Sequence, residues 1–136
     1  MLRTHLAIMV EPYLTRVLAG EKTIESRFSR SRIPPYGCVA AGDLIWLKRA
    51  GGPVLASARA SEVRQYSGLS GKQVDALLAR WGPELNLEAD FAARARECRY
   101  ATLIWLGEIV LLPEPQAYRR RGRQGWVHDT DFPRII

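Results

Sequence analysis

The sequence has few residues that form covalent or metal cross-links, with two cysteines and two histidines among its 136 residues. Cys38 and Cys98 stand alone, without a CxxC pair or a nearby histidine, and neither His5 nor His128 has a partner at metal-ligand spacing. These absences argue against a disulfide framework and against a zinc site. We therefore expect reduced cysteines, with Cys98 buried in a helix, structural histidines, and no metal or cofactor.

Long apolar runs and familiar catalytic motifs are also absent. Residues 101–113 form the longest apolar segment, but Gly107 and Glu108 interrupt it before the ~20 residues of a membrane helix are reached. No charged-then-apolar leader opens the chain, so we expect a cytoplasmic protein without a membrane partner. The sequence has no Gly-rich phosphate loop, GxSxG elbow, HExxH motif, internal repeat or low-complexity region.

The composition is that of an ordinary globular protein, with 47% hydrophobic and 25% charged residues. A chain of 136 residues is long enough for one proper core, so we expect a single domain over residues 1–136. The charge is +6, from 20 Lys and Arg against 14 Asp and Glu, and the excess is mostly arginine. Arginine favours phosphate-bearing partners, although many basic proteins bind no nucleic acid.

Hydrophobic periodicity predicts short strands interrupted by helices. The expected strands are residues 5–10, 23–28, 43–49, 54–66 and a bent strand at 100–106 and 109–112 closed by 113–115, with one more strand after the basic tail. The expected helices are residues 11–19, one from the Ser70 capping box to Gly82-Pro83, and one over 87–98. Residues 29–42 are an expected loop, long enough to suggest a function. This order predicts an α+β fold, a small β-barrel decorated by helices.

A charged motif, GxKxxExR, follows the first predicted helix. Gly20 is a natural helix stop, because glycine adopts the left-handed conformation without steric penalty. The alternation of the following strand places Glu25 and Arg27 on one face, and Lys22 approaches from the turn. Lys22 and Arg27 can fix a phosphate or polarise a carbonyl, and Glu25 can accept a base N–H or act as a general base. The alternative is a charged strand face in which Glu25 and Arg27 simply pair.

A second basic segment precedes the last strand. Its arginines are Arg119, Arg120, Arg121 and Arg123, flanked by Tyr118 and Trp126. Charge beside flat aromatic surfaces is typical of contacts with single-stranded nucleic acid. Arg30, in the long loop, can extend the same surface. The alternative is a solvated basic loop with Trp126 in the core.

The motif in this setting resembles the ASCH superfamily of PUA-like barrels. The resemblance rests on Gly20-x-Lys22-x-x-Glu25-x-Arg27 after a helix, the Gly42-Asp43 strand entry, the strand from Tyr100, and Gly125-Trp126-Val127 near the end. It implies a pseudobarrel of about five to six strands, with one helix after the first strand and two before the last long strand. It also implies a cleft beside the first helix and binding of RNA.

Some members of that superfamily are described as ribonucleases, and others as amidohydrolases on acetylated cytidine. In the amidohydrolases the catalytic lysine matches Lys22, and Glu84 is the best match for a glutamate between the two later helices. Glu25 occupies the position of their threonine nucleophile and cannot supply a hydroxyl. The resemblance thus predicts RNA or nucleotide binding around Lys22, Glu25 and Arg27. One alternative is a hydrolase that uses Lys22, Glu25 and Glu84, and another is a protein-interaction module with an apolar patch instead of a basic cleft.

Overall fold

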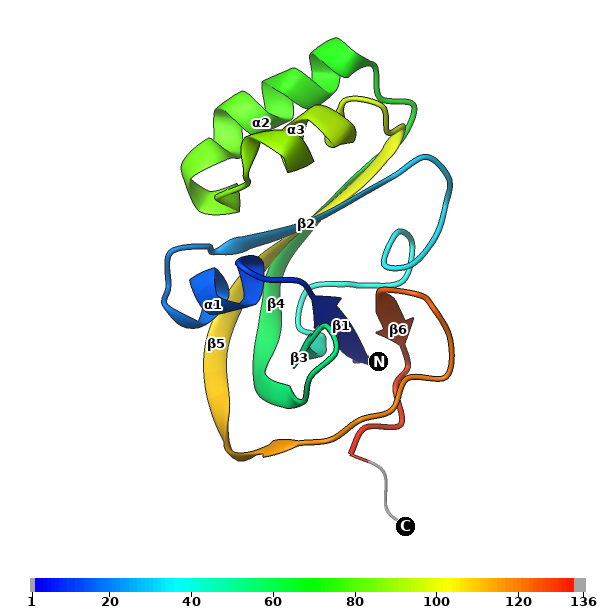
Figure 1. The fold of residues 1–136 in the computed structure, drawn as a ribbon. Coiled ribbons are helices and arrows are strands. Elements are labelled where there is room, and N and C mark those ends of the chain that lie inside the picture. Colours follow the sequence, from blue (N-terminus) through cyan, green and yellow to red (C-terminus); the bar gives the residue numbers. More distant parts are fainter. Residues whose placement is uncertain (1, 134–136) are drawn as a thin grey trace.

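The computed structural model describes residues 2–133, and its elements follow the predicted order (Figure 1). The strands are β1 (Thr4–Met9), β2 (Ile24–Ser29), β3 (Leu44–Arg49), β4 (Val54–Tyr66), β5 (Tyr100–Gln116) and β6 (Trp126–His128). The helices are α1 (Tyr13–Leu18), α2 (Gly71–Leu85) and α3 (Ala89–Ala95). The α+β class is confirmed, with one helix after the first strand and two before the long β5.

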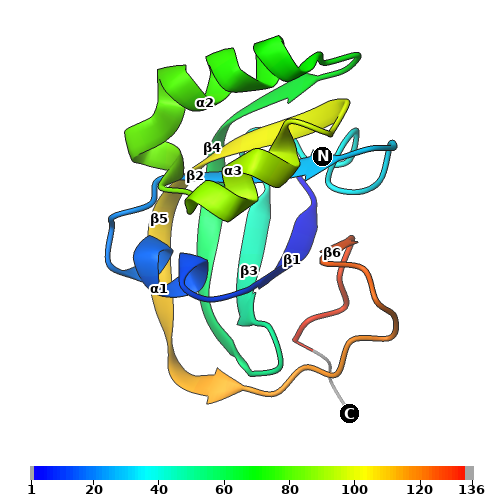
Figure 2. The ribbon, with the colours of Figure 1, turned by 45° about the horizontal axis from the view of Figure 1, so that its top comes forward.

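Within residues 2–133, six strands form one sheet in the order β2-β5-β4-β3-β1-β6. β1 pairs with β3 in parallel, and every other neighbouring pair is antiparallel. The pairing of β4 with β5 shifts register at several places, and such bulges bend a strand and increase its twist. The sheet therefore curls into a half-barrel (Figure 2), with β2 at one edge and β6 at the other.

The main core lies between α1 and the curled sheet. Three small residues, Ala56, Ala58 and Ala60, alternate along β4 and face this core. Because they occupy little volume, Leu14 and Val17 of α1 pack close to the sheet and are almost fully buried. The short first helix is thereby fixed over the open side of the half-barrel.

The second layer consists of α2 and α3, which cover the outer face of β2 and β5 (Figure 1). Ser70 and Gln73 form the predicted capping box. The prediction that Gly82-Pro83 ends α2 is wrong, because the chain kinks at Trp81 and then makes a further turn to Leu85. Proline is tolerated where a helix restarts, since its missing N–H has no partner there. No helix in residues 2–133 is long and apolar enough to cross a membrane.

Two other predicted boundaries also differ from the structure. β5 does not close at 113–115 but runs on to Gln116, because Val54 at the start of β4 still pairs with that residue. The last helix ends at Ala95, so Cys98 lies after it and is only half-buried. The bend near Gly107 is present, since Gly107 pairs with Arg59 beside a register shift.

Candidate functional site

A pocket of about 420 Å³ lies where the half-barrel is open, between the edge strand β2 and the end of β1. Helices α1 and α3 and the segment before β6 complete its walls. Its lining residues are Ile8, Met9, Val10, Tyr13, Lys22, Glu25, Ser26, Arg27, Phe28, Ala50, Leu87, Phe91, Arg120 and Gly125. The three charged residues of the sequence motif therefore line one pocket, which we call the main pocket.

Lys22 reaches the pocket because the chain turns sharply after α1. Gly20 has a φ of +77°, and the Lys22 amide donates to the Arg16 carbonyl at 3.1 Å, so the turn folds back on the helix. The Lys22 Nζ then donates to the Leu85 carbonyl at 2.5 Å. Leu85 is the last residue of α2, where free carbonyls and the helix dipole favour a cation. Lys22 thus caps α2 from inside the protein.

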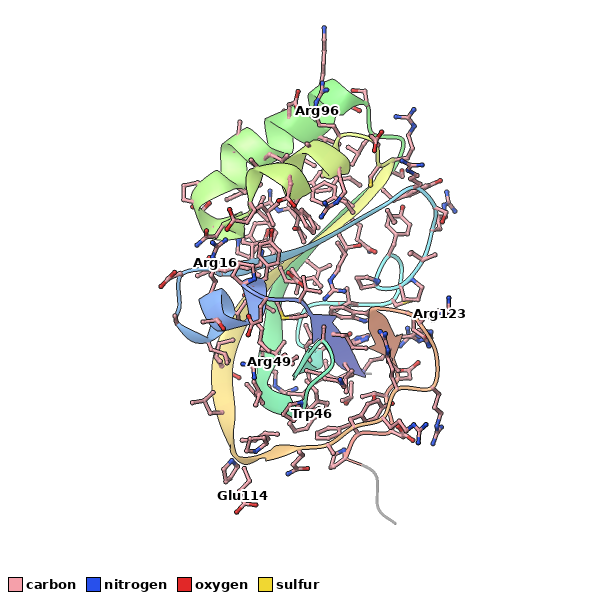
Figure 3. All side chains as sticks on the ribbon, in the orientation of Figure 1. Arg16, Trp46, Arg49, Arg96, Glu114 and Arg123 are labelled. Carbon is pink, nitrogen blue, oxygen red and sulfur yellow. The ribbon has the colours of Figure 1, made fainter. Side chains whose placement is uncertain are left out.

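The same turn ties the first helix to the later pair. The Thr23 amide donates to the Glu84 carbonyl at 3.0 Å. Arg16 of α1 donates to the Asn86 carbonyl at 3.1 Å and pairs with Glu88 at 2.6 Å. Figure 3 shows Arg16 between α1 and the lower ends of α2 and α3. The motif is therefore held by non-local contacts rather than by its own strand alone.

Burial changes the electrostatics of Lys22, whose side chain is 1% exposed. Loss of water lowers the pKa of Lys22 below its ordinary value of 10.5, and Glu25, with Oε1 at 3.7 Å from Nζ, counteracts this only in part. Nearby Arg27 adds a smaller lowering effect. A buried amine with a lowered pKa is a feature of functional sites as well as of structural ion networks.

Glu25 links the two cations. Its Oε1 also accepts the Ser26 amide at 3.2 Å, and its Oε2 accepts Arg27 Nε at 2.9 Å. The Glu25 side chain is only 9% exposed, and both of its carboxylate oxygens have hydrogen-bond partners inside the protein. The predicted Glu25–Arg27 pair exists, but it lies in a pocket wall and not on the open surface.

Arg27 spans the opening of the half-barrel. Its Nη2 donates to the Ile8 carbonyl and its Nη1 to the Gly125 carbonyl, each at 3.1 Å. The guanidinium also lies 5.4 Å from the centre of the Trp126 ring, a cation–π distance. One side chain thus joins β2 to β1 and to the segment before β6.

Buried polar groups hold Trp126 beneath that guanidinium. The Trp126 indole donates to His5 Nδ1 at 3.2 Å, and His5 Nε2 lies 2.8 Å from an Asp43 oxygen. Burial raises the pKa of Asp43, but hydrogen bonds from the Arg3 and Ala40 amides and from His5 outweigh it and leave the pKa lowered. The structural role predicted for His5 fits this arrangement, and Trp126 is a core residue.

Glu84 approaches the motif through its backbone and not through its carboxylate. Glu84 is not among the residues that line the main pocket, and within the described part of the chain its buried Oε2 has no hydrogen-bond partner. The geometry brings Lys22 and Glu25 together but leaves Glu84 outside. A catalytic role for Glu84 therefore stays a prediction without support from its position.

The fold places the arginines of the basic segment before β6 in different surroundings. Arg120 lines the main pocket, whereas Arg121 pairs with Asp131 at 3.1 Å. Arg119 and Arg123 are exposed, and Figure 3 shows Arg123 beside β6, on the opposite side of the view from Arg16. Arg30 is exposed and pairs with Glu97 at 3.2 Å. Of these predicted nucleic-acid contacts, only Arg120 joins the three motif residues.

The pocket also contains residues that the sequence did not single out for function. Tyr13 and Phe91 meet edge to face with ring centres 5.5 Å apart, and the Tyr13 ring lies 5.4 Å from Lys22 Nζ. Both residues follow the apolar periodicity of a helix, which predicts core packing and gives no signal of a ligand wall. Within residues 2–133, no three His, Cys, Asp or Glu side chains come together in a way that could hold a metal ion.

Comparison with solved structures shows which fold this is. The ASCH protein of Zymomonas mobilis matches with a TM-score of 0.64 and 21% identity, over 83% of this chain and 72% of that one. A point mutant of the same protein matches with 22% identity over 82% and 73%. The hypothetical protein PH0355 matches more weakly, with a TM-score of 0.50 and 17% identity over 75% and 94%. No protein-family model and no curated protein matches the chain. The fold of this chain is that of an ASCH domain protein.

Proposed function

We propose that the main pocket binds one nucleotide unit of a single-stranded RNA or a free nucleotide. The observation that carries the proposal is the composition of the pocket wall, where Lys22, Glu25 and Arg27 lie beside the rings of Tyr13 and Phe91. Pockets of roughly 300–1,000 Å³ that combine apolar walls with a few placed polar groups are typical ligand sites. The volume of about 420 Å³ falls in that range.

Two neighbouring cations, Arg120 in the wall of the main pocket and Lys48 close to it, support an anionic ligand. Burial lowers the pKa of Lys48, and the positive charge of Arg120 lowers it further. The Lys48 ammonium donates to the Arg49 carbonyl at 3.1 Å, and that contact does not neutralise it. Because Arg120 lines the pocket, a phosphate held there relieves the repulsion between the two cations.

Titration with the four nucleoside monophosphates and with a short single-stranded RNA tests this proposal. We expect measurable binding by calorimetry, and its loss in Lys22→Met, because methionine fills the same space without the ammonium. Arg96→Gln is the matched control, since Arg96 is an exposed cation that pairs with Asp75 at 2.7 Å and does not line the main pocket. Equal affinity of wild type and Lys22→Met for every ligand would contradict the proposal.

A second candidate function is hydrolysis of RNA or of an amide in a modified nucleoside. The lowered pKa of Lys22 favours it, because a lower pKa brings the amine closer to the neutral form that can take a proton from an attacking group. The pocket also holds hydroxyls. The Tyr13 hydroxyl accepts a hydrogen bond from the Glu88 amide at 3.2 Å, and the buried Ser26 hydroxyl has no hydrogen-bond partner in the part of the chain that the structure describes. Chromatography of acetylated cytidine and of short RNAs after incubation with the protein separates turnover from binding alone.

The protein-interaction alternative predicted an apolar patch in place of a charged cleft. The pocket is charged, and β5 does expose Val110 and Leu111 at 58% and 64%. These residues lie on the far half of β5, away from the pocket lining. Nothing in the described structure shows what covers them, so nucleotide binding is the better supported function.

A further inference from the structure

A second, smaller pocket lies on the other side of the Arg27 bridge. It measures about 160 Å³ and shares Arg27, Phe28 and Gly125 with the main pocket. The other residues of its wall come from the end of β2, from the loop after it, from β5 and from β6: Ser29, Ile33, Pro34, Pro35, Tyr36, Thr102 and Trp126. The long loop that the sequence marked as functional therefore forms one wall of this pocket.

Thr102 gives the second pocket an unsatisfied polar group. The residue is 1% exposed, and its Oγ1 has no hydrogen-bond partner among residues 2–133. Thr102 stands directly opposite Arg27 in the pairing of β2 with β5. A buried hydroxyl without a partner reduces stability, and valine has the same shape without that cost. A hydroxyl at this position is therefore better explained by a ligand than by packing.

Arg27 contributes a second polar group at the same place. Its guanidinium has five N–H donors, and the bond to the Gly125 carbonyl uses one of the two on Nη1. Among residues 2–133 the structure shows no second acceptor for Nη1, and Arg27 lines the second pocket as well as the main one. A ligand that enters there meets a wall that contains Thr102 and Arg27 and is otherwise mostly apolar.

The size of the pocket limits that ligand to one small ring. A cavity of about 150 Å³ holds a benzene molecule, so about 160 Å³ suits a single six-membered ring and not a whole nucleotide. Pro34, Pro35 and Tyr36 present flat or rigid apolar surfaces. A pyrimidine base combines two apolar faces with a polar edge of donors and acceptors, which matches this distribution of groups.

We propose that the second pocket binds the pyrimidine base next to the nucleotide held in the main pocket. The phosphodiester between the two crosses the Arg27 bridge, where the guanidinium is close and one N–H is open. This inference rests on the proposed nucleotide binding in the main pocket and adds a second subsite with a preference for pyrimidine over purine. The site would thus recognise a dinucleotide step.

Calorimetric titration with UMP, AMP, UpU and ApA tests the second subsite. We expect UpU to bind at least about tenfold more tightly than UMP, from one added hydrogen-bonded ring, and ApA to gain little over AMP. Thr102→Val should weaken UpU binding about fivefold, the effect of one lost hydrogen bond, and leave UMP binding unchanged. Thr102→Ser, which keeps the hydroxyl, should retain the UpU affinity.

The outcomes separate this inference from the proposed function. If UMP and AMP bind but UpU gains nothing, or if Thr102→Val leaves the UpU affinity intact, the second subsite is wrong and nucleotide binding stands. If none of the four ligands binds, the proposed function fails and the subsite fails with it. Thr102→Val should melt at the wild-type temperature or above, so loss of UpU binding cannot be ascribed to unfolding.

Discussion

At the scale of single residues, Glu25 and Lys22 contribute unequally to the site. Glu25 pairs with two cations, Lys22 and Arg27. Lys22 pairs with one anion, Glu25, and also donates to the carbonyl at the end of α2. Removal of one partner from a buried ion pair is costly mainly because it leaves the other charge uncompensated. When Lys22 is removed, Glu25 still pairs with Arg27. When Glu25 is removed, both Lys22 and Arg27 lose the carboxylate that they share.

We therefore predict that Glu25→Gln is much more destabilising than Lys22→Met. Glu25→Gln should lower the free energy of unfolding by about 3 kcal/mol, because two cations then face each other in the pocket wall. Lys22→Met should change it by no more than about 1 kcal/mol, since release of a buried charge offsets the lost cap. Urea denaturation followed by circular dichroism measures both values. Equal losses in the two variants would show that Lys22 is mainly a structural residue.

The lowered pKa of Lys22 also predicts a pH dependence of stability. The ordinary value of 10.5 applies to the unfolded chain, and burial lowers the pKa in the folded state. Between these two values the unfolded state binds more protons, so the free energy of unfolding rises with pH. At lower pH both states are protonated, and the cost of the buried ammonium is fully present.

The measurement compares wild type with Lys22→Met in urea from about pH 7 to about pH 10. Wild type should gain stability relative to the variant as the pH rises, because the variant lacks the titrating amine. Other titrating groups cancel in the difference. A difference that stays constant, or that falls with pH, would show that the Lys22 pKa is not lowered.

At the scale of elements, the short strand β6 depends on contacts from distant parts of the chain. It has three residues and pairs with β1, and Arg27 of β2 holds the segment before it through the Gly125 carbonyl. Trp126 adds the buried hydrogen bond to His5. Closure of the half-barrel therefore depends strongly on the guanidinium of Arg27.

We predict that Arg27→Lys weakens the attachment of β6 and the segment before it to β1 and β2. A lysine has a single ammonium and cannot reach Glu25, Ile8 and Gly125 together, so about 2 kcal/mol of stability should be lost. Hydrogen exchange should become faster at Trp126–His128 and near the end of β1. Arg94→Lys is the control, because its exposed pair with Asp90 contributes little. Unchanged exchange at β6 in Arg27→Lys would contradict the role of a bridge.

The elements that the sequence predicted well are those specified by local signals. Alternation placed Glu25 and Arg27 together, the Ser70 box began α2, and Gly20 ended α1. The predicted end of α2 was wrong because Gly82-Pro83 is a typical helix stop in a sequence. In the structure the chain kinks at Trp81, and a new helical turn begins after the kink. The local pattern carries no information about such a restart.

The parts of the site that were missed come from non-local contacts. The Gly125 carbonyl meets Arg27 across 98 positions in sequence, and no motif marks a glycine carbonyl as an acceptor. Glu84 was selected for its carboxylate, yet the fold uses its carbonyl to bind the Thr23 amide. The identity of a residue predicts side-chain chemistry, but helix ends bring backbone groups into a site that no residue type reveals.

At the scale of the whole molecule, the net charge does not show which positive charges are available to a ligand. The net charge is +6, but many exposed arginines are paired with carboxylates, as Arg30 is with Glu97 and Arg121 is with Asp131. Arg120 differs, because it lines the main pocket and its charge acts on Lys48. The phosphate contacts of a bound strand should therefore be concentrated at Arg27 and Arg120, which both line the main pocket, and not spread over the basic segment.

We predict that Arg120 and Arg121 respond differently when the salt dependence of RNA binding is measured. The logarithm of the binding constant of wild type should fall linearly with the logarithm of salt concentration, because phosphate contacts release counterions. Arg120→Gln should reduce that slope by about 0.7, the value for one contact to a single strand. Arg121→Gln is the matched control and should leave the slope nearly unchanged, since Asp131 already neutralises this arginine. A flat dependence in wild type, or equal changes in both variants, would show that the strand does not cross the mouth of the main pocket.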